Sequence, residues 1–240
     1  MNAFIRGFKD GIPIALGYIA VSFTFGLTAV TGGLTVWQAT MISLMCVTSA
    51  GQFAGIDIML AAGGYMEMAM AQLVINLRYA LMSISLSQKA DSSMNFFARL
   101  FVGFGVTDEI FAVAVGNNKS ISRKYMFGLI VLPWLSWTFG TLGGALLGSI
   151  LPEILASAFG IAIYGMFLAI IIPAARDDNK IIGVLMVAVS ISLLLYYTPL
   201  KHHISQGFAI ITAAVAASLF GALVYPIDNE TTEDMKEVSQ

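Results

Sequence analysis

Residues 11–56 of the chain read GIPIALGYIAVSFTFGLTAVTGGLTVWQATMISLMCVTSAGQFAGI and contain no Asp, Glu, Lys or Arg. A helix needs about 20 predominantly apolar residues to cross the hydrocarbon core of a bilayer. This run is therefore long enough for two such helices, with a turn expected near Thr31-Gly32-Gly33. Four further uncharged runs follow at 125–152, 154–175, 181–200 and 202–227, and each is long enough for one helix.

The composition of the whole chain is that of a membrane protein. Of its 240 residues, 58% are hydrophobic and 11% are charged, whereas a soluble domain has about 45–50% and 25%. These values exclude a disordered chain and a nucleic-acid binder. The single cysteine, Cys46, allows neither an internal disulfide nor a cysteine metal site. Because P-loop and G-x-S-x-G motifs are absent from the sequence, we expect no enzyme, no catalytic residue, no cofactor and no metal.

Two more apolar stretches, 66–88 and 96–116, carry charges inside them. Together with the uncharged runs they predict an all-α polytopic membrane protein of about eight transmembrane helices. The expected helices cover residues 12–31, 37–62, 66–88, 96–116, 126–150, 154–175, 180–199 and 205–225. Residues 1–226 then form a single transmembrane domain, and residues 227–240 form a mobile acidic cytoplasmic tail.

Lys and Arg in short loops predict how the chain is oriented in the membrane. With the N-terminus inside and eight crossings, most cations fall inside: Arg6, Lys9, Lys119, Arg123, Lys124, Arg176, Lys180 and Lys236. Lys89 and Lys201 fall outside, with Arg99 close by. We therefore expect a multi-pass protein of the cell membrane with both termini in the cytoplasm, in which Lys89 and Lys119 face opposite sides.

A short sequence match suggests an internal repeat. Thr24-Phe25-Gly26 in the first expected helix recurs as Thr138-Phe139-Gly140 in the fifth, and the same shift carries helices two to four close to helices six to eight. The match predicts a parallel repeat of four helices plus four. Chance similarity remains the alternative, because only three residues agree.

Charged side chains at bilayer depth point to a functional site. Arg78 lies near the centre of the third expected helix, and Asp108 and Glu109 lie at the centre of the fourth. Each charge costs at least about 2.5–3.5 kcal/mol on insertion scales, so we expect the cation to meet an anion between neighbouring helices. The pair could simply fix packing. Because two acids face one arginine, however, one carboxyl is left that could carry a proton, which predicts proton coupling through Asp108 or Glu109.

The middle of the second expected helix is unusually small and polar. It contains Ser49, Gly51 and Gln52, and Gly51 and Gly55 have the G-x-x-x-G spacing of close helix packing. The other interpretation is a broken helix whose backbone polar groups line a cavity. Asn76 precedes Arg78 by two residues, about 200° away on a regular helix, so it either serves another neighbour or lies in an irregular turn. The candidate substrate-binding residues are Ser49, Gly51, Gln52, Asn76 and Arg78.

Several motifs occur in order along residues 1–226. They are Gly11-Ile12-Pro13 with Gly17, Phe25-Gly26, Ser49-Ala50-Gly51-Gln52-Phe53, Asn76-Leu77-Arg78-Tyr79-Ala80-Leu81 and Thr107-Asp108-Glu109. With the glycine-rich fifth helix, they resemble the AzlC-type family, the large subunit of two-component branched-chain amino-acid exporters. Thr48 to Phe53 departs from the family's usual F-A-G-S-A-Q-F. The resemblance implies export of Val, Leu, Ile or Met at the expense of the proton gradient, and a small AzlD-type partner of about four spans.

These observations together predict a membrane transporter subunit that exports branched-chain or similar apolar amino acids. The alternatives are a channel-like permease for another small solute and a structural subunit of a membrane complex. Uphill movement driven by an ion gradient would distinguish a transporter from a channel.

Overall fold

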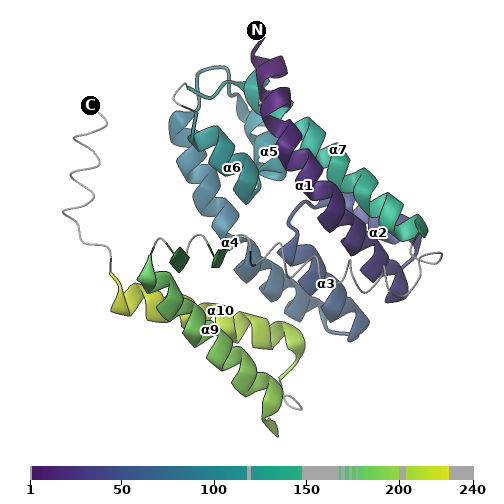
Figure 1. Cartoon of the computed structure of the whole chain (residues 1–240), viewed down its shortest axis with the longest axis vertical. Helices are drawn as coiled ribbons and strands as arrows, with labels where there is room; N and C mark the ends of the chain where they lie inside the picture. Colours follow the sequence, from purple (N-terminus) through teal and green to yellow (C-terminus); the bar gives the residue numbers. More distant parts are fainter. Residues whose placement is uncertain are drawn as a thin grey trace. The chain divides into compact units, whose positions relative to one another are not determined.

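The computed structural model describes residues 2–117, 120–147, 168, 171–172, 175–176, 178–199 and 204–226 (Figure 1). Within these residues there are nine helices, and five of them are long and apolar enough to cross a membrane. The prediction of an all-α polytopic membrane protein is confirmed. The expected tail at 227–240 and most of the expected helix at 154–175 lie outside the described residues.

The contacts divide the chain into two units, which are described separately. Unit 1 comprises Met1–Ala62 and Ile75–Phe167, and unit 2 comprises Gly63–Val74 and Leu168–Gln240. The helices of unit 1 are α1 (Ala3–Thr31), α2 (Val36–Met45), α3 (Ala50–Leu60), the later part of α4 (Tyr65–Lys89), α5 (Phe96–Gly105), α6 (Asp108–Val115) and α7 (Arg123–Leu147). Unit 2 contains the start of α4 together with α9 (Asn179–Tyr197) and α10 (Gln206–Val224).

Helices α1 and α7 lie side by side along their lengths and make the most extensive helix contact in unit 1 (Figure 1). Glycines allow their backbones to touch. A Cβ atom on Gly7 would overlap the Tyr125 carbonyl, and one on Gly26 would overlap the Thr141 carbonyl. Because the early residues of α1 meet the early residues of α7, and the late residues meet the late ones, the two helices run parallel.

Helices α2 and α3 form a re-entrant hairpin, which we call hairpin 1. The second expected helix is broken, which was one of the two interpretations of its sequence, because α2 ends at Met45 and α3 begins at Ala50. Ser43 near the end of α2 accepts a hydrogen bond from Gln52 near the start of α3. Leu60 at the end of α3 lies against Gly32, where α1 has just ended. The chain therefore turns back at the break and does not cross at 37–62, where one crossing was expected.

Helices α5 and α6 form a second re-entrant hairpin, hairpin 2. The sequence predicted one continuous helix at 96–116, and the structure corrects this. Val106 and Thr107 are extended, and the Thr107 hydroxyl accepts a hydrogen bond from the Ile110 amide. Thr107 thus caps a new helix. The first turn of this helix carries Asp108 and Glu109, whose negative charges are stabilised by the positive end of the helix dipole. The ammonium of Lys89 bonds the Val115 carbonyl, so α6 ends where α4 ends.

This arrangement gathers the cations of unit 1 at one end, which we call the basic end. Lys89 and Ile121 are hydrogen-bonded neighbours, so α4 ends beside the start of α7. Lys119 lies outside the described residues, but Arg123 and Lys124, which were expected on the same side as Lys119, lie at the same end as Lys89. The expectation that Lys89 faces the other side is therefore wrong, because hairpin 2 returns the chain to its starting side. Within the described part of unit 1, every Lys and Arg except Arg78 lies in or next to the elements of this end: Arg6, Lys9, Lys89, Arg99, Arg123 and Lys124.

The two hairpins enter from opposite ends of unit 1. Hairpin 1 follows the far end of α1, and hairpin 2 follows the end of α4 at the basic end. The two three-helix segments, α1 to α3 and α4 to α6, therefore have inverted topologies. The parallel direction of α1 and α7 agrees with the expected four-plus-four repeat. The fourth elements differ, however, because α10 is continuous where hairpin 2 is broken.

A buried carboxylate joins the start of α4 to α10 within unit 2. Glu67, in the first turn of α4, accepts a hydrogen bond from the Ser205 hydroxyl and another, of 2.9 Å, from the Gly207 amide. The carboxylate therefore caps the N-terminus of α10, where the helix dipole is positive. Helices α9 and α10 pack against each other, and their other faces carry exposed apolar side chains suited to lipid.

Candidate functional site

The tips of the two hairpins meet halfway along α7. The indole nitrogen of Trp134, in the middle of α7, donates a hydrogen bond of 2.9 Å to the Leu44 carbonyl at the tip of hairpin 1. The same indole meets the Phe104 ring of hairpin 2 edge-on, with ring centres 6.1 Å apart. Both helix breaks are therefore at the depth of Trp134.

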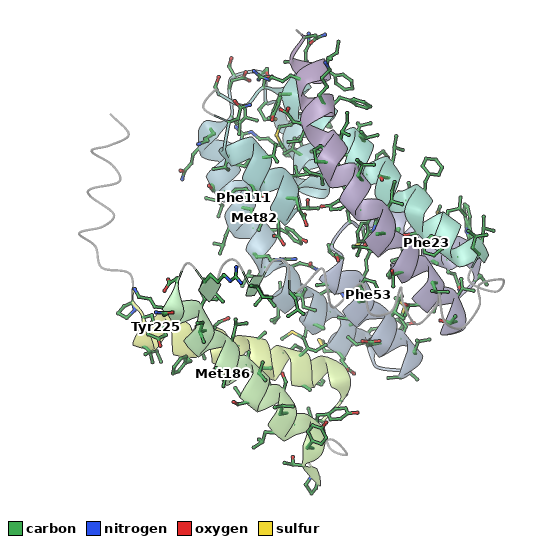
Figure 2. All side chains as sticks on the ribbon, in the orientation of Figure 1. Phe23, Phe53, Met82, Phe111, Met186 and Tyr225 are labelled. Carbon is green, nitrogen blue, oxygen red and sulfur yellow. The ribbon has the colours of Figure 1, made fainter. Side chains whose placement is uncertain are left out.

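A single hydrophobic cluster surrounds both breaks. It includes Val47 from the first break and Val106 from the second. Phe53, Met82 and Phe111, labelled in Figure 2, come from α3, α4 and α6, and all three pack against this cluster. Apolar side chains thus surround the two positions at which the helices are interrupted.

Arg78 and Asp108 form an ion pair at the second break. The pairing predicted from their common depth is confirmed. Arg78 also donates to the Tyr79 hydroxyl at 3.2 Å and lies over the Tyr79 ring. Within the described residues, Arg78 Nε and Asp108 Oδ1 are shielded from solvent and have no hydrogen-bond partner. The pair therefore keeps one donor and one acceptor available for a ligand.

Glu109 has a different partner. The hydroxyl of Tyr18 on α1 lies 2.7 Å from Glu109 Oε2 and 2.6 Å from Thr107 Oγ1. Tyr18 and Thr107 are both buried. The two adjacent acids are thus distinguished by the structure, since Asp108 faces a permanent cation and Glu109 faces a neutral phenol.

Gln52 has both ends of its amide occupied within the protein. Its oxygen accepts from the Trp137 indole at 2.9 Å, and its nitrogen donates to Ser43 at 2.9 Å. Ser43 is also bonded to Thr141 of α7, at 2.7 Å. Gln52 therefore fastens hairpin 1 to α7, whereas the sequence suggested a residue that faces the substrate.

Ser49 precedes α3 in a strained conformation. Its φ of 48° is unusual for a residue with a side chain, and α3 has no side-chain cap at its N-terminus. The Ser49 hydroxyl is shielded from solvent and has no hydrogen-bond partner within the described residues. Gly51 is buried in the first turn of α3, and Asn76 is half-buried on α4, two residues before Arg78.

Sequence reasoning missed four residues of this site: Tyr18, Thr107, Trp134 and Trp137. Tyr18 lies within an uncharged run, and a phenol at bilayer depth needs a partner. Thr107 followed by two acids is a recognisable helix start. The sequence contained both of these signals, whereas nothing in it indicated which residues the two tryptophans would contact.

Comparison with known proteins places this site within a family. The AzlC protein family matches residues 13–151, a range that contains both hairpins and the whole of α7. The chain belongs to the AzlC family. The inner membrane protein YgaZ of Escherichia coli (strain K12) is 31% identical over 186 residues, which cover 74% of this chain and 76% of that protein.

Two further relatives of this AzlC-family chain come from distant organisms. A membrane protein of Archaeoglobus fulgidus is 32% identical over 178 residues, covering 73% of the chain and 78% of the relative. The branched-chain amino acid transport protein AzlC of Bacillus subtilis (strain 168) is 25% identical over 150 residues, covering 61% and 58%. No solved structure matches the chain.

Proposed function

We propose that the chain is the large subunit of a transporter that exports branched-chain or similar apolar amino acids in exchange for protons. The observation that carries this proposal is the Arg78–Asp108 ion pair, which lies beside Glu109 where the tips of two oppositely directed hairpins meet. The printed name of the Bacillus subtilis relative supports the substrate class. A small AzlD-type membrane subunit of about four spans is the partner that we propose.

The site offers groups for each part of an amino acid. The carboxylate would bind Arg78 and the Ser49 hydroxyl, which precedes the first turn of α3 at Gly51, because guanidinium groups and the positive ends of helix dipoles both attract anions. The ammonium would bind Asp108 and the Asn76 amide. The apolar side chain would pack among Phe53, Met82 and Phe104. Such a pocket discriminates between two substrates that differ by one methylene by only about 1–3 kcal/mol. Gln52 would hold hairpin 1 in the geometry that this requires.

Glu109 is the acid that we assign to proton coupling, because Asp108 already has a cationic partner. We expect Glu109→Gln to exchange labelled leucine across a liposome membrane at a rate within a few-fold of the unmodified protein. It should lose the ability to concentrate leucine when a proton gradient is imposed.

Asp108→Asn is the matched comparison, since it neutralises the adjacent acid. Unlike Glu109→Gln, this variant should lose the exchange of leucine in addition to its concentration, because it removes the counter-charge of Arg78. Normal concentration of leucine by both variants would mean that neither acid couples transport to protons.

The cations of unit 1 support an orientation for the proposed transporter. Cytoplasmic loops carry an excess of Lys and Arg. We therefore place the basic end in the cytoplasm, with the N-terminus, and we keep both chain termini on that side. Gly33 and Gly64 adjoin the far ends of α1 and α3, and would then face outward.

Labelling of single cysteines tests this orientation after Cys46, the only cysteine in the sequence, has been replaced by serine. Cysteines at Lys89 and Lys124 should react with a membrane-impermeant maleimide only in permeabilised cells. Cysteines at Gly33 and Gly64 should react in intact cells. Opposite labelling of Lys89 and Lys124 would contradict hairpin 2, because a re-entrant segment returns both positions to one side.

Counterflow in liposomes tests the transport function itself. Liposomes loaded with unlabelled leucine should take up labelled leucine, valine or isoleucine, and glycine should compete weakly. The chain should be assayed with and without its proposed small subunit. Downhill movement that cannot be driven uphill would favour the channel-like permease, and no movement in either preparation would favour the structural subunit.

A further inference from the structure

Tyr18 connects the two hairpins through one side chain. Its hydroxyl contacts Thr107 and Glu109 of hairpin 2, as described above. Its ring meets the Trp137 ring edge-on, with centres 5.1 Å apart and an interplanar angle of 75°. Trp137 in turn bonds Gln52 of hairpin 1. A continuous chain of contacts therefore runs from the Glu109 carboxylate to the break between α2 and α3.

The hydrogen bonds of Tyr18 depend on the charge of Glu109. A phenol has one proton to donate, so it cannot donate to both oxygen neighbours. When Glu109 is ionised it can only accept, so Tyr18 donates to Glu109 and Thr107 donates to Tyr18. When Glu109 binds a proton it becomes a donor, and Tyr18 can then accept from Glu109 and donate to Thr107.

This reversal changes the second helix break. The Thr107 oxygen accepts from the Ile110 amide and caps α6. In one charge state of Glu109 this oxygen must also donate to Tyr18, and in the other it also accepts from Tyr18. The loss of charge removes an anion from the first turn of α6, where the helix dipole favours one. The forces on the Tyr18 hydroxyl therefore differ between the ionised and the protonated state of Glu109.

We propose that Tyr18 is a positioning residue that transmits the protonation of Glu109 to hairpin 1 through Trp137 and Gln52. The inference rests on the proposed function in one respect, the proton exchange at Glu109. No atoms other than the incoming proton are gained: the proton binds a Glu109 carboxylate oxygen, and the hydrogen bonds along Tyr18 and Thr107 reverse. The edge-on contact between the Tyr18 and Trp137 rings carries the resulting shift of the phenol toward the first turn of α3.

Other charged groups face the same point. Asp108 adjoins Glu109 on α6, and Tyr79 faces it from α4, where Arg78 is paired with Asp108. From α1 the group is Tyr18 itself, and α7 contributes only the neutral Trp137. Because Arg78 is paired with Asp108, a change in the charge of Glu109 acts most directly on its hydrogen-bond partner, Tyr18.

Tryptophan fluorescence tests the inference without any substrate. The chain has three tryptophans, so replacing Trp37 and Trp134 by phenylalanine leaves Trp137 as the reporter. In liposomes, the emission of Trp137 should change with pH in one sigmoidal step. Glu109→Gln should abolish the step, and so should Tyr18→Phe, which keeps the ring and removes only the hydroxyl.

Tyr125→Phe is the matched control. Tyr125 also belongs to the α1–α7 pair and donates to a carboxylate, Asp10, at 2.9 Å, but it lies at the basic end. This variant should keep the pH step. An unchanged step in Tyr18→Phe, or an equal loss in Tyr125→Phe, would overturn the inference.

Transport assays separate this inference from the proposed function. Tyr18→Phe should keep leucine counterflow within a few-fold while losing at least about tenfold in proton-driven concentration. If the unmodified protein moves no branched-chain amino acid, the proposed function fails, and the fluorescence result still decides the role of Tyr18. If Tyr18→Phe does not fold, Thr107→Val removes the other hydroxyl and should flatten the pH step, whereas Thr107→Ser should restore it.

Discussion

Replacing Arg78 by alanine is expected to abolish amino-acid exchange and to reduce the yield of folded protein. The change leaves Asp108 at bilayer depth without its counter-charge. An unpaired charge at that depth costs at least about 2.5–3.5 kcal/mol on insertion scales. The variant also loses the cation that we assign to the substrate carboxylate. Counterflow should therefore fall to the level of empty liposomes.

The double variant Arg78→Ala with Asp108→Ala separates stability from function. It removes both charges, so folding should recover while exchange remains absent. Arg99→Ala is the matched control, because Arg99 lies exposed in the first turn of α5 at the basic end. It should exchange leucine normally. Exchange at an unmodified rate by Arg78→Ala would remove Arg78 from the proposed binding site.

Replacing Gly144 by alanine is expected to destabilise the central helix pair. A Cβ atom at this position would overlap the Phe23 carbonyl, which belongs to the backbone of α1 and cannot rotate away. The helices would have to separate, with a cost of about 1–3 kcal/mol or more. For a chain of this size, that lowers the melting temperature by roughly 2–12 °C.

Gly143 provides the control for this change, since it is the adjacent residue of the same helix. Its Cβ atom would lie 3.7 Å from the Phe23 ring, an ordinary contact. Gly143→Ala should therefore melt near the temperature of the unmodified protein when both variants are heated in detergent and followed by size exclusion. Equal melting temperatures for the two variants would show that the α1–α7 backbones do not touch.

The membrane class and the Arg78–Asp108 pair could be predicted because both follow from local properties. Long uncharged runs require lipid, and charges at equal depth require each other. The re-entrant hairpins could not be predicted from hydropathy. An apolar stretch of about 25 residues satisfies the bilayer equally well when it crosses once or when it enters halfway and returns.

Particular residues show where further signals were available. Thr107-Asp108-Glu109 is a helix start, and interpreting the acids only as charges inside a helix hid the second break. Gln52 was correctly singled out as unusual, yet its role depends on Trp137, 85 residues later in the chain. Such pairings are decided by how the helices pack, and local patterns carry no information about them.

Hairpin 1 also constrains the order in which the protein can assemble during synthesis. Gln52 and Ser43 enter the bilayer long before their partners on α7 exist, because Trp137 follows Gln52 by 85 residues. At about 5–20 residues per second, a ribosome needs roughly 4–17 s to bridge that interval. During this time the Gln52–Ser43 bond can form within hairpin 1, whereas the bonds of these two residues to Trp137 and Thr141 cannot. Hairpin 1 can make its contacts with α7 only after α7 has left the ribosome. One of the first segments to be synthesised is therefore among the last to reach its final position.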